Sequence, residues 1–93
     1  MAVSTIQNRN FLTATTSVTV TLSSTTTVSY SASIAKDGYK PLAIAGWYLN
    51  RNDVIPTTII VDNEQETVRG GLSKTSSGSA TVQLSVRIVY EPN

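Results

Sequence analysis

Six carboxylates are the strongest candidates for catalysis in this chain of 93 residues, which has no histidine and no cysteine. They are Asp37, Asp53, Asp62, Glu64, Glu66 and Glu91. Two such acids could cleave a glycosidic bond, but all six fall in predicted turns or at strand ends, where acids normally serve as solvated turn residues. General acid–base chemistry near neutral pH most often uses histidine, and no Gly-x-Ser-x-Gly motif is present. We therefore expect a protein that is not an enzyme and has no cofactor.

A calcium site is the second chemistry that the acidic residues suggest. Asp62, Asn63 and Glu66, with Asp53 as a further ligand, offer side-chain oxygens of the kind that Ca²⁺ prefers. An Asx turn followed by a solvated acidic loop explains the same residues. We favour the turn and predict no metal site.

Charge and hydropathy exclude two classes of partner. The net charge is +1, only 14% of residues are charged, and the basic residues are scattered singly along the chain. A nucleic-acid partner is therefore not expected, because phosphate recognition needs a basic patch. No apolar stretch approaches the roughly 20 residues of a membrane-spanning helix, so membrane insertion is not expected either.

Alternating apolar and hydroxyl residues are the main structural signal. The pattern occupies Ser17–Ser23, Thr26–Ala35 and Ala80–Ile88, and it predicts strands with one buried and one solvated face. Leu42–Leu49 and Thr57–Val61 are nearly continuously apolar, which indicates strands covered on both sides. Glu66–Leu72 is a weaker strand. Its Gly70-Gly71 pair indicates a bulge or a close backbone approach.

Turn residues separate these six strands. Ser23–Thr25 is predicted to form a hairpin between the first two strands, and Asp37-Gly38 lies at the centre of a turn over Lys36–Pro41. Six short strands without helical signals predict an all-β fold, a small antiparallel β-sandwich or jelly-roll-like domain. We assign residues 13–93 to this domain and residues 1–12 to an N-terminal arm or linker.

Oligomerisation is expected because the core is small and neither disulfides nor a histidine-based metal site can reinforce it. Trp47 and Tyr48 are adjacent on a predicted strand, so they point to opposite faces, one of them into the core and the other outward. Together with Ile59 and Val61 they are the candidate interface residues.

Three segments bear a family resemblance. Gly38-Tyr39-Lys40-Pro41-Leu42 is followed by Ala43–Asn50, which contains Gly-Trp-Tyr-Leu, and Ala80–Tyr90 is an apolar final strand. This order resembles the small C-terminal domains of tail-fibre and baseplate proteins in phages and prophages of gut Firmicutes. Their pattern is a Gly-Tyr-x-Pro turn, a Gly-Trp/Phe/Asn-x-Leu strand and a last strand ending near Leu/Val-Tyr. The resemblance covers Thr15 to Tyr90.

This resemblance implies a homotrimeric receptor-binding knob or fibre tip on the virion, synthesised in the host cytoplasm. Such a domain contacts a bacterial surface polysaccharide through its loops. The candidate ligand-binding residues in the loops are Tyr39, Lys40, Arg51, Asn52, Asp53, Asn63 and Lys74. Tyr39 could stack on a sugar ring or pack under its own loop. The chain departs from the family pattern at Arg51–Asp53 and Asp62–Glu66, so the binding specificity does not carry over.

Two other functions stay open. One is a purely structural virion component, such as a capsid decoration or a trimerisation knob without a ligand. The other is a cellular carbohydrate-binding or immunoglobulin-like module.

Overall fold

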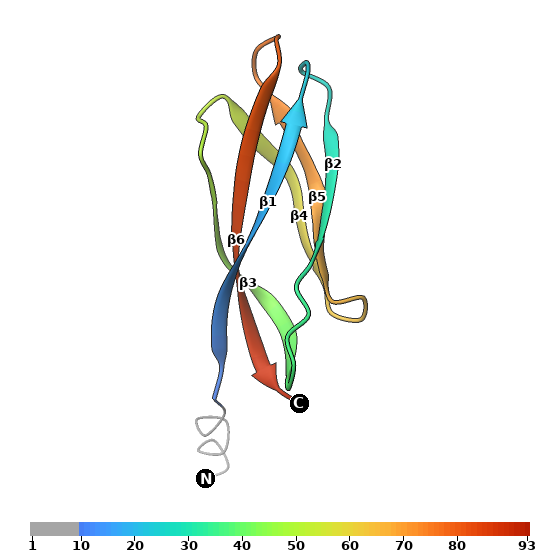
Figure 1. Cartoon of the computed structure of the whole chain (residues 1–93), viewed down its shortest axis with the longest axis vertical. Helices are drawn as coiled ribbons and strands as arrows, with labels where there is room; N and C mark the ends of the chain where they lie inside the picture. The colour runs from blue at the N-terminus through green and yellow to red at the C-terminus, as the bar shows by residue number, and fades with distance from the viewer. Residues whose placement is uncertain (1–9) are drawn as a thin grey trace.

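The computed structural model describes residues 10–93, and this part of the chain forms six β-strands and no helix (Figure 1). The strands are β1 (Leu12–Leu22), β2 (Val28–Ser33), β3 (Tyr39–Leu49), β4 (Val54–Asp62), β5 (Thr67–Lys74) and β6 (Ala80–Pro92). The predicted all-β class is confirmed. Within residues 10–93, accordingly, there is no helix long and apolar enough to cross a membrane.

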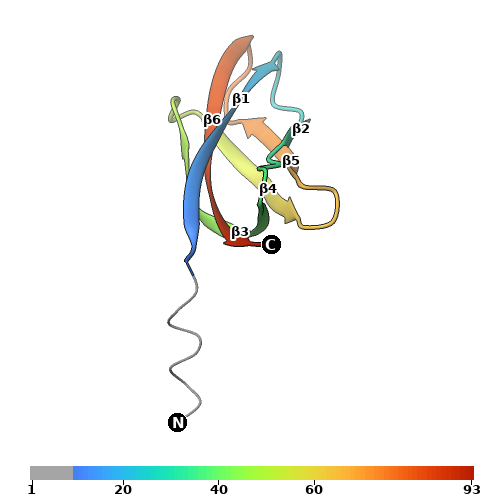
Figure 2. The same ribbon diagram turned by 60° about the horizontal axis from the view of Figure 1, so that its bottom comes forward.

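Two antiparallel three-stranded sheets pack against each other as a small β-sandwich (Figures 1 and 2). Sheet A has the order β1-β6-β3, and sheet B has the order β2-β5-β4. Only β4 and β5 follow each other within one sheet, so every other connection crosses between the sheets. Three of the four strand pairs, β1–β6, β3–β6 and β2–β5, therefore join strands that are not consecutive in the chain.

The hairpin predicted at Ser23–Thr25 is wrong, because β1 and β2 belong to different sheets. β1 pairs instead with β6 along its whole length, from Leu12 opposite Tyr90 to Leu22 opposite Ala80. The connecting residues are all serine and threonine. They lack the Asn-Gly or Gly-containing pair that a tight two-residue hairpin requires, and the chain crosses to the other sheet instead.

The predicted boundary of the N-terminal arm is one residue too late. Leu12 is already paired with Tyr90, so the sandwich begins there and not at residue 13. Residues 1–9, which make up most of the predicted arm, lie outside the described residues.

The core lies under β6, the central strand of sheet A. Its even-numbered residues from Ala80 to Tyr90 are all buried, whereas its odd-numbered residues are not. The alternation predicted for this strand is thus confirmed. Facing it are the buried Tyr30 of β2, Val54 of β4, and Val68 and Leu72 of β5.

Two irregularities in β3 decide which of its side chains face the core. The register against β6 shifts between Pro41 and Ala43, and again between Ile44 and Gly46. After the second shift, Gly46 lies opposite Arg87 and Tyr48 opposite Ser85, on the outer face of sheet A. Because side chains alternate along a strand, one inserted residue reverses the faces of all the residues that follow.

Gly70 and Gly71 allow the backbone of β4 to approach β5 closely in sheet B. β4 has a bulge between Pro56 and Thr58, opposite these glycines. A Cβ atom on Gly70 would overlap the Thr58 carbonyl oxygen, which also accepts a hydrogen bond of 3.1 Å from the Tyr30 hydroxyl. Of the two predicted alternatives, a bulge or a close backbone approach at the glycines, the close approach is confirmed, and the bulge lies in the neighbouring strand β4.

The loops gather at the two ends of the sandwich. β1 begins and β6 ends at one end, which also carries the β2–β3 and β4–β5 connections (Figure 1). The predicted Asp37-Gly38 turn is present there: the Tyr39 amide donates to the Lys36 carbonyl at 3.0 Å, and Gly38 has a φ of 80°. The β1–β2, β3–β4 and β5–β6 connections lie at the opposite end.

Candidate functional site

Lys74, at the end of β5, is the only buried charged residue among residues 10–93. Its Nζ atom donates hydrogen bonds to the Ser76 carbonyl (3.1 Å), the Ser76 hydroxyl (3.0 Å) and the Ser77 carbonyl (3.2 Å). It also lies 3.6 Å from the Asp53 carboxylate. Since a buried cation needs partners for all its donors, Lys74 holds the β5–β6 loop in place.

Asp53 connects this loop to the β3–β4 loop. Its carboxylate accepts two hydrogen bonds of 2.9 Å from the Arg51 guanidinium, and its carbonyl accepts the Thr75 amide at 2.8 Å. The hydrogen bonds from Arg51 are the main reason that the pKa of Asp53 is lowered to about 2. Asp53 is therefore ionised at neutral pH and is unsuited to serve as a general acid.

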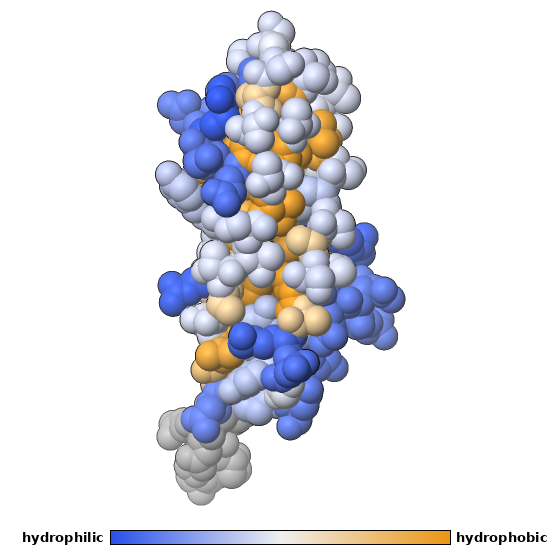
Figure 3. Space-filling model, in the orientation of Figure 1, coloured by the Kyte–Doolittle hydropathy of each residue, from blue (hydrophilic) through white to orange (hydrophobic). Residues whose placement is uncertain are grey.

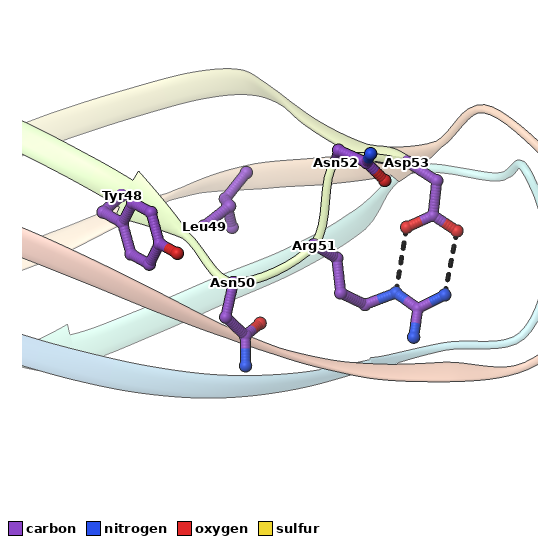
Figure 4. A pocket seen from close by; sticks show the side chains of 6 residues that line it. All are labelled: Tyr48, Leu49, Asn50, Arg51, Asn52 and Asp53. Carbon is purple, nitrogen blue, oxygen red and sulfur yellow. Dashed lines mark hydrogen bonds and ion pairs between the residues drawn. The ribbon is translucent and has the colours of Figure 1, made fainter.

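An open pocket of about 650 Å³ lies beside this ion pair (Figure 4). Its lining consists of Tyr48, Leu49, Asn50, Arg51, Asn52 and Asp53. Asn50 is fixed to β6, because its side-chain oxygen accepts the Gln83 amide at 2.9 Å. The side-chain amide of Asn52 and the hydroxyl of Tyr48 make no hydrogen bond with any residue of the described part. They are available to a bound molecule.

Four of the seven predicted ligand residues come together here: Arg51, Asn52, Asp53 and Lys74. Lys74 is a supporting residue, because its ammonium group is already surrounded. The other three, Tyr39, Lys40 and Asn63, belong to the opposite end of the sandwich.

Two of these three residues, Tyr39 and Asn63, have structural roles, whereas Lys40 is exposed. Tyr39 is partly buried and packs against the core, which favours packing over sugar stacking. The Asn63 side-chain amide donates to the carbonyls of Pro41 (2.7 Å) and Leu42 (3.3 Å) and so joins the β4–β5 turn to β3.

The acidic turn after β4 has the Asx geometry that we favoured. The Asp62 carboxylate accepts the backbone amides of Glu64 (3.1 Å) and Gln65 (3.0 Å). Asp53, the additional calcium ligand that we considered, lies in the β3–β4 loop at the other end and cannot join this turn.

Two of the four predicted interface residues face inward. Ile59 and Val61 are partly buried and pack against the core. The exposed apolar residues of β4 are instead Ile55 and Ile60, because Ile60 lies opposite Arg69 on the outer face of sheet B. The bulge near Pro56 reverses which side chains of the following residues face outward, and the sequence pattern could not reveal this reversal.

Trp47 and Tyr48 point to opposite faces as predicted, with Trp47 opposite the buried Val86 and Tyr48 opposite Ser85. The expectation that one of them belongs to the core is wrong, because Trp47 is 51% and Tyr48 is 66% exposed. β3 is an edge strand, so even its inward positions are incompletely covered.

A second groove, of about 260 Å³, runs over sheet A and shares Tyr48 with the pocket. Its lining consists of Thr15, Ala45, Gly46, Trp47, Tyr48, Ser85 and Arg87. Sequence reasoning missed Thr15, Gly46, Ser85 and Arg87 as site residues. The position of Arg87 on the hydroxyl face of the last strand was a visible signal, but its neighbours depend on the β3–β6 register.

Comparisons with protein-family models, with curated proteins and with solved structures found no match. The function must therefore be inferred from the chemistry of the pocket and the groove. Both offer an exposed aromatic ring, uncommitted hydrogen-bonding groups and an open shape, which suit reversible binding of a small polar molecule.

Replacing Lys74 tests its role in supporting the pocket. Lys74→Met should lower the free energy of unfolding by about 2 kcal/mol, because charged hydrogen bonds are lost. Hydrogen exchange should also become faster in the β3–β4 and β5–β6 loops. The exposed Lys36→Met is the matched control and should change stability by less than about 0.5 kcal/mol. Equal stabilities of the two variants in urea denaturation would contradict this role.

Proposed function

We propose that this chain is an adhesion domain of a phage virion, which assembles as a homotrimer and binds a bacterial surface saccharide. The observation that carries the proposal is an open pocket at the loop end of the sandwich, lined by both the exposed Tyr48 ring and the uncommitted side-chain amide of Asn52. The binding residues are Tyr48, Arg51 and Asn52. Asp53 and Lys74 hold them in position.

A saccharide is the ligand class that this chemistry suits. The C–H face of a sugar ring packs against an aromatic ring, and its hydroxyls pair with amide groups that both donate and accept. The guanidinium of Arg51 is held in one orientation by Asp53. Since the loop is ordered before the ligand arrives, less conformational entropy is lost on binding.

The virion location is supported by the resemblance to tail-fibre and baseplate domains and by the position of the pocket. The pocket lies in the β3–β4 loop, at the end of the sandwich away from the start of β1 and the end of β6 (Figure 1). A domain attached through either of these strands would direct the pocket away from the attachment point.

Self-association is supported by an apolar strip that runs along the molecule over β1 and β2 (Figure 3). Partly buried apolar residues on these strands include Val18, Val28 and Ala32. β1 and β2 are also edge strands of their sheets, and association would cover both edges. This arrangement leaves Trp47 and Tyr48, which we expected at the interface, free to bind ligand. Three linked sites would compensate for weak affinity at each one.

The homotrimer predicts a molar mass in solution of three times the 9.9 kDa of one chain. Light scattering coupled to size exclusion measures this mass. Tyr48→Ala should leave it unchanged, because Tyr48 lies outside the β1–β2 strip. A monomer at every concentration measured would refute the trimer.

Saccharide binding predicts that the labelled chain attaches to some strains in a panel of gut Firmicutes and that periodate oxidation of the cells removes the attachment. Flow cytometry should show at least a tenfold loss for Tyr48→Ala and a clear loss for Asn52→Ala. Gln65→Ala, in the loop at the opposite end, is the control and should bind normally. A trimer that attaches to no strain would instead favour a purely structural virion component.

A further inference from the structure

We propose that the groove over Gly46 on the outer face of sheet A is a second saccharide subsite, and that it selects a sugar bearing a carboxylate. This inference depends on the proposed function and extends it by specifying the chemical class of the ligand. It follows from the shape of the groove, from the charge of Arg87 and from the continuity of the groove with the loop pocket.

The floor of the groove is hollow because Gly46 has no side chain. A Cβ atom built on Gly46 would find no heavy atom within 4 Å, so the space above it is open. Tyr48 follows two residues later on the same face and provides an aromatic wall. The volume of about 260 Å³ lies below the range of roughly 300–1,000 Å³ typical of drug-sized ligands and suits a single sugar ring.

Arg87 gives the groove its charge. It lies directly opposite Gly46, and the only side-chain hydrogen bond of its guanidinium with the described part of the chain goes to the Thr13 hydroxyl at 3.3 Å. Between residues 10 and 93, Arg51 and Arg69 each have an aspartate partner, whereas Arg87 has none. None of the residues that line the groove is acidic.

A guanidinium with uncommitted donors pairs best with a planar carboxylate, which it can bind through two parallel hydrogen bonds. The hydroxyls of Thr15 and Ser85 flank it on the same surface. The Ser85 hydroxyl already shares a hydrogen bond of 3.2 Å with the Ser17 hydroxyl, but a hydroxyl both donates and accepts, so each of the two can still pair with a sugar hydroxyl. A sugar acid therefore satisfies the aromatic, hydroxyl and cationic parts of the groove together. A neutral sugar would leave the arginine without an anionic partner.

Tyr48 lines both the groove and the loop pocket. A saccharide chain could therefore place one residue in each, with the acidic residue over Gly46. Binding through this surface would recognise an acidic polysaccharide and not a single sugar.

The test is an NMR titration of the ¹⁵N-labelled chain of 93 residues with D-glucuronate, D-glucose and glucose 6-phosphate. Glucuronate should shift the amide signals of Gly46, Ser85 and Arg87 and bind about fivefold more tightly than glucose, as expected for one exposed ion pair. Arg87→Gln should remove this preference. Arg69→Gln, on the outer face of sheet B, is the matched control and should retain it.

Gly46→Val fills the groove without changing its charge. Because no atom lies near the Gly46 Cβ position and valine suits a strand, this variant should fold normally and lose glucuronate binding. Equal affinity for glucuronate and glucose would overturn the proposal, as would a preference that survives Arg87→Gln. Tighter binding of glucose 6-phosphate than of glucuronate would replace the carboxylate by a phosphate and also overturn it.

Two further results separate this inference from other accounts. A loss of the trimer in Gly46→Val would identify the groove as a contact between copies of the chain and refute the subsite. If Asn52→Ala loses cell attachment but Arg87→Gln and Gly46→Val retain it, the proposed function stands and the subsite is refuted.

Discussion

The pairing of β3 with β6 is the constraint on which the rest of this structure depends. β6 provides the central row of core residues and fixes the register of both of its neighbours. In β3 the register shift before Gly46 places Gly46 and Tyr48 outside, opposite Arg87 and Ser85. Without it, the alternation of the strand would turn Tyr48 toward the core and Trp47 outward. The groove and the rim of the loop pocket both follow from this one inserted residue.

A second arrangement supports the site from sheet B. The bulge in β4 is accommodated because Gly70 leaves room for the Thr58 carbonyl, and the Tyr30 hydroxyl donates a hydrogen bond to this carbonyl. β4 begins at Val54, directly after the loop that Asp53 and Lys74 hold in place. Small cores without disulfides have little stability to spare, so satisfied buried polar groups are important here. No buried side-chain nitrogen or oxygen between residues 10 and 93 lacks a hydrogen-bond partner.

The sequence predicted local features well and long-range pairing poorly. Alternation predicted three of the six strands and continuous apolar runs predicted two more, and Asp37-Gly38 and Asp62 identified two of the turns, because these signals depend on neighbouring residues. The hairpin expected at Ser23–Thr25 failed because pairing of the first strand with the last leaves no local trace. Ile59 and Val61 were placed outward, and one of Trp47 and Tyr48 in the core, because bulges and edge positions decide burial. Arg51, Asn52 and Asp53 could be grouped from the sequence as candidate ligand residues since they form one loop, whereas Arg87 and Gly46 meet only through the sheet.

The most direct test of this account is disulfide trapping of the β3–β6 register, which is simple to interpret because the natural chain has no cysteine. Tyr48→Cys with Ser85→Cys places two thiols directly opposite each other on the same face, where a disulfide can form. Trp47→Cys with Ser85→Cys places them on opposite faces. After mild oxidation, mass spectrometry should find an intramolecular disulfide in the first pair and free thiols in the second. The reverse result would show that the register shift before Gly46 is absent and would contradict the site built on it.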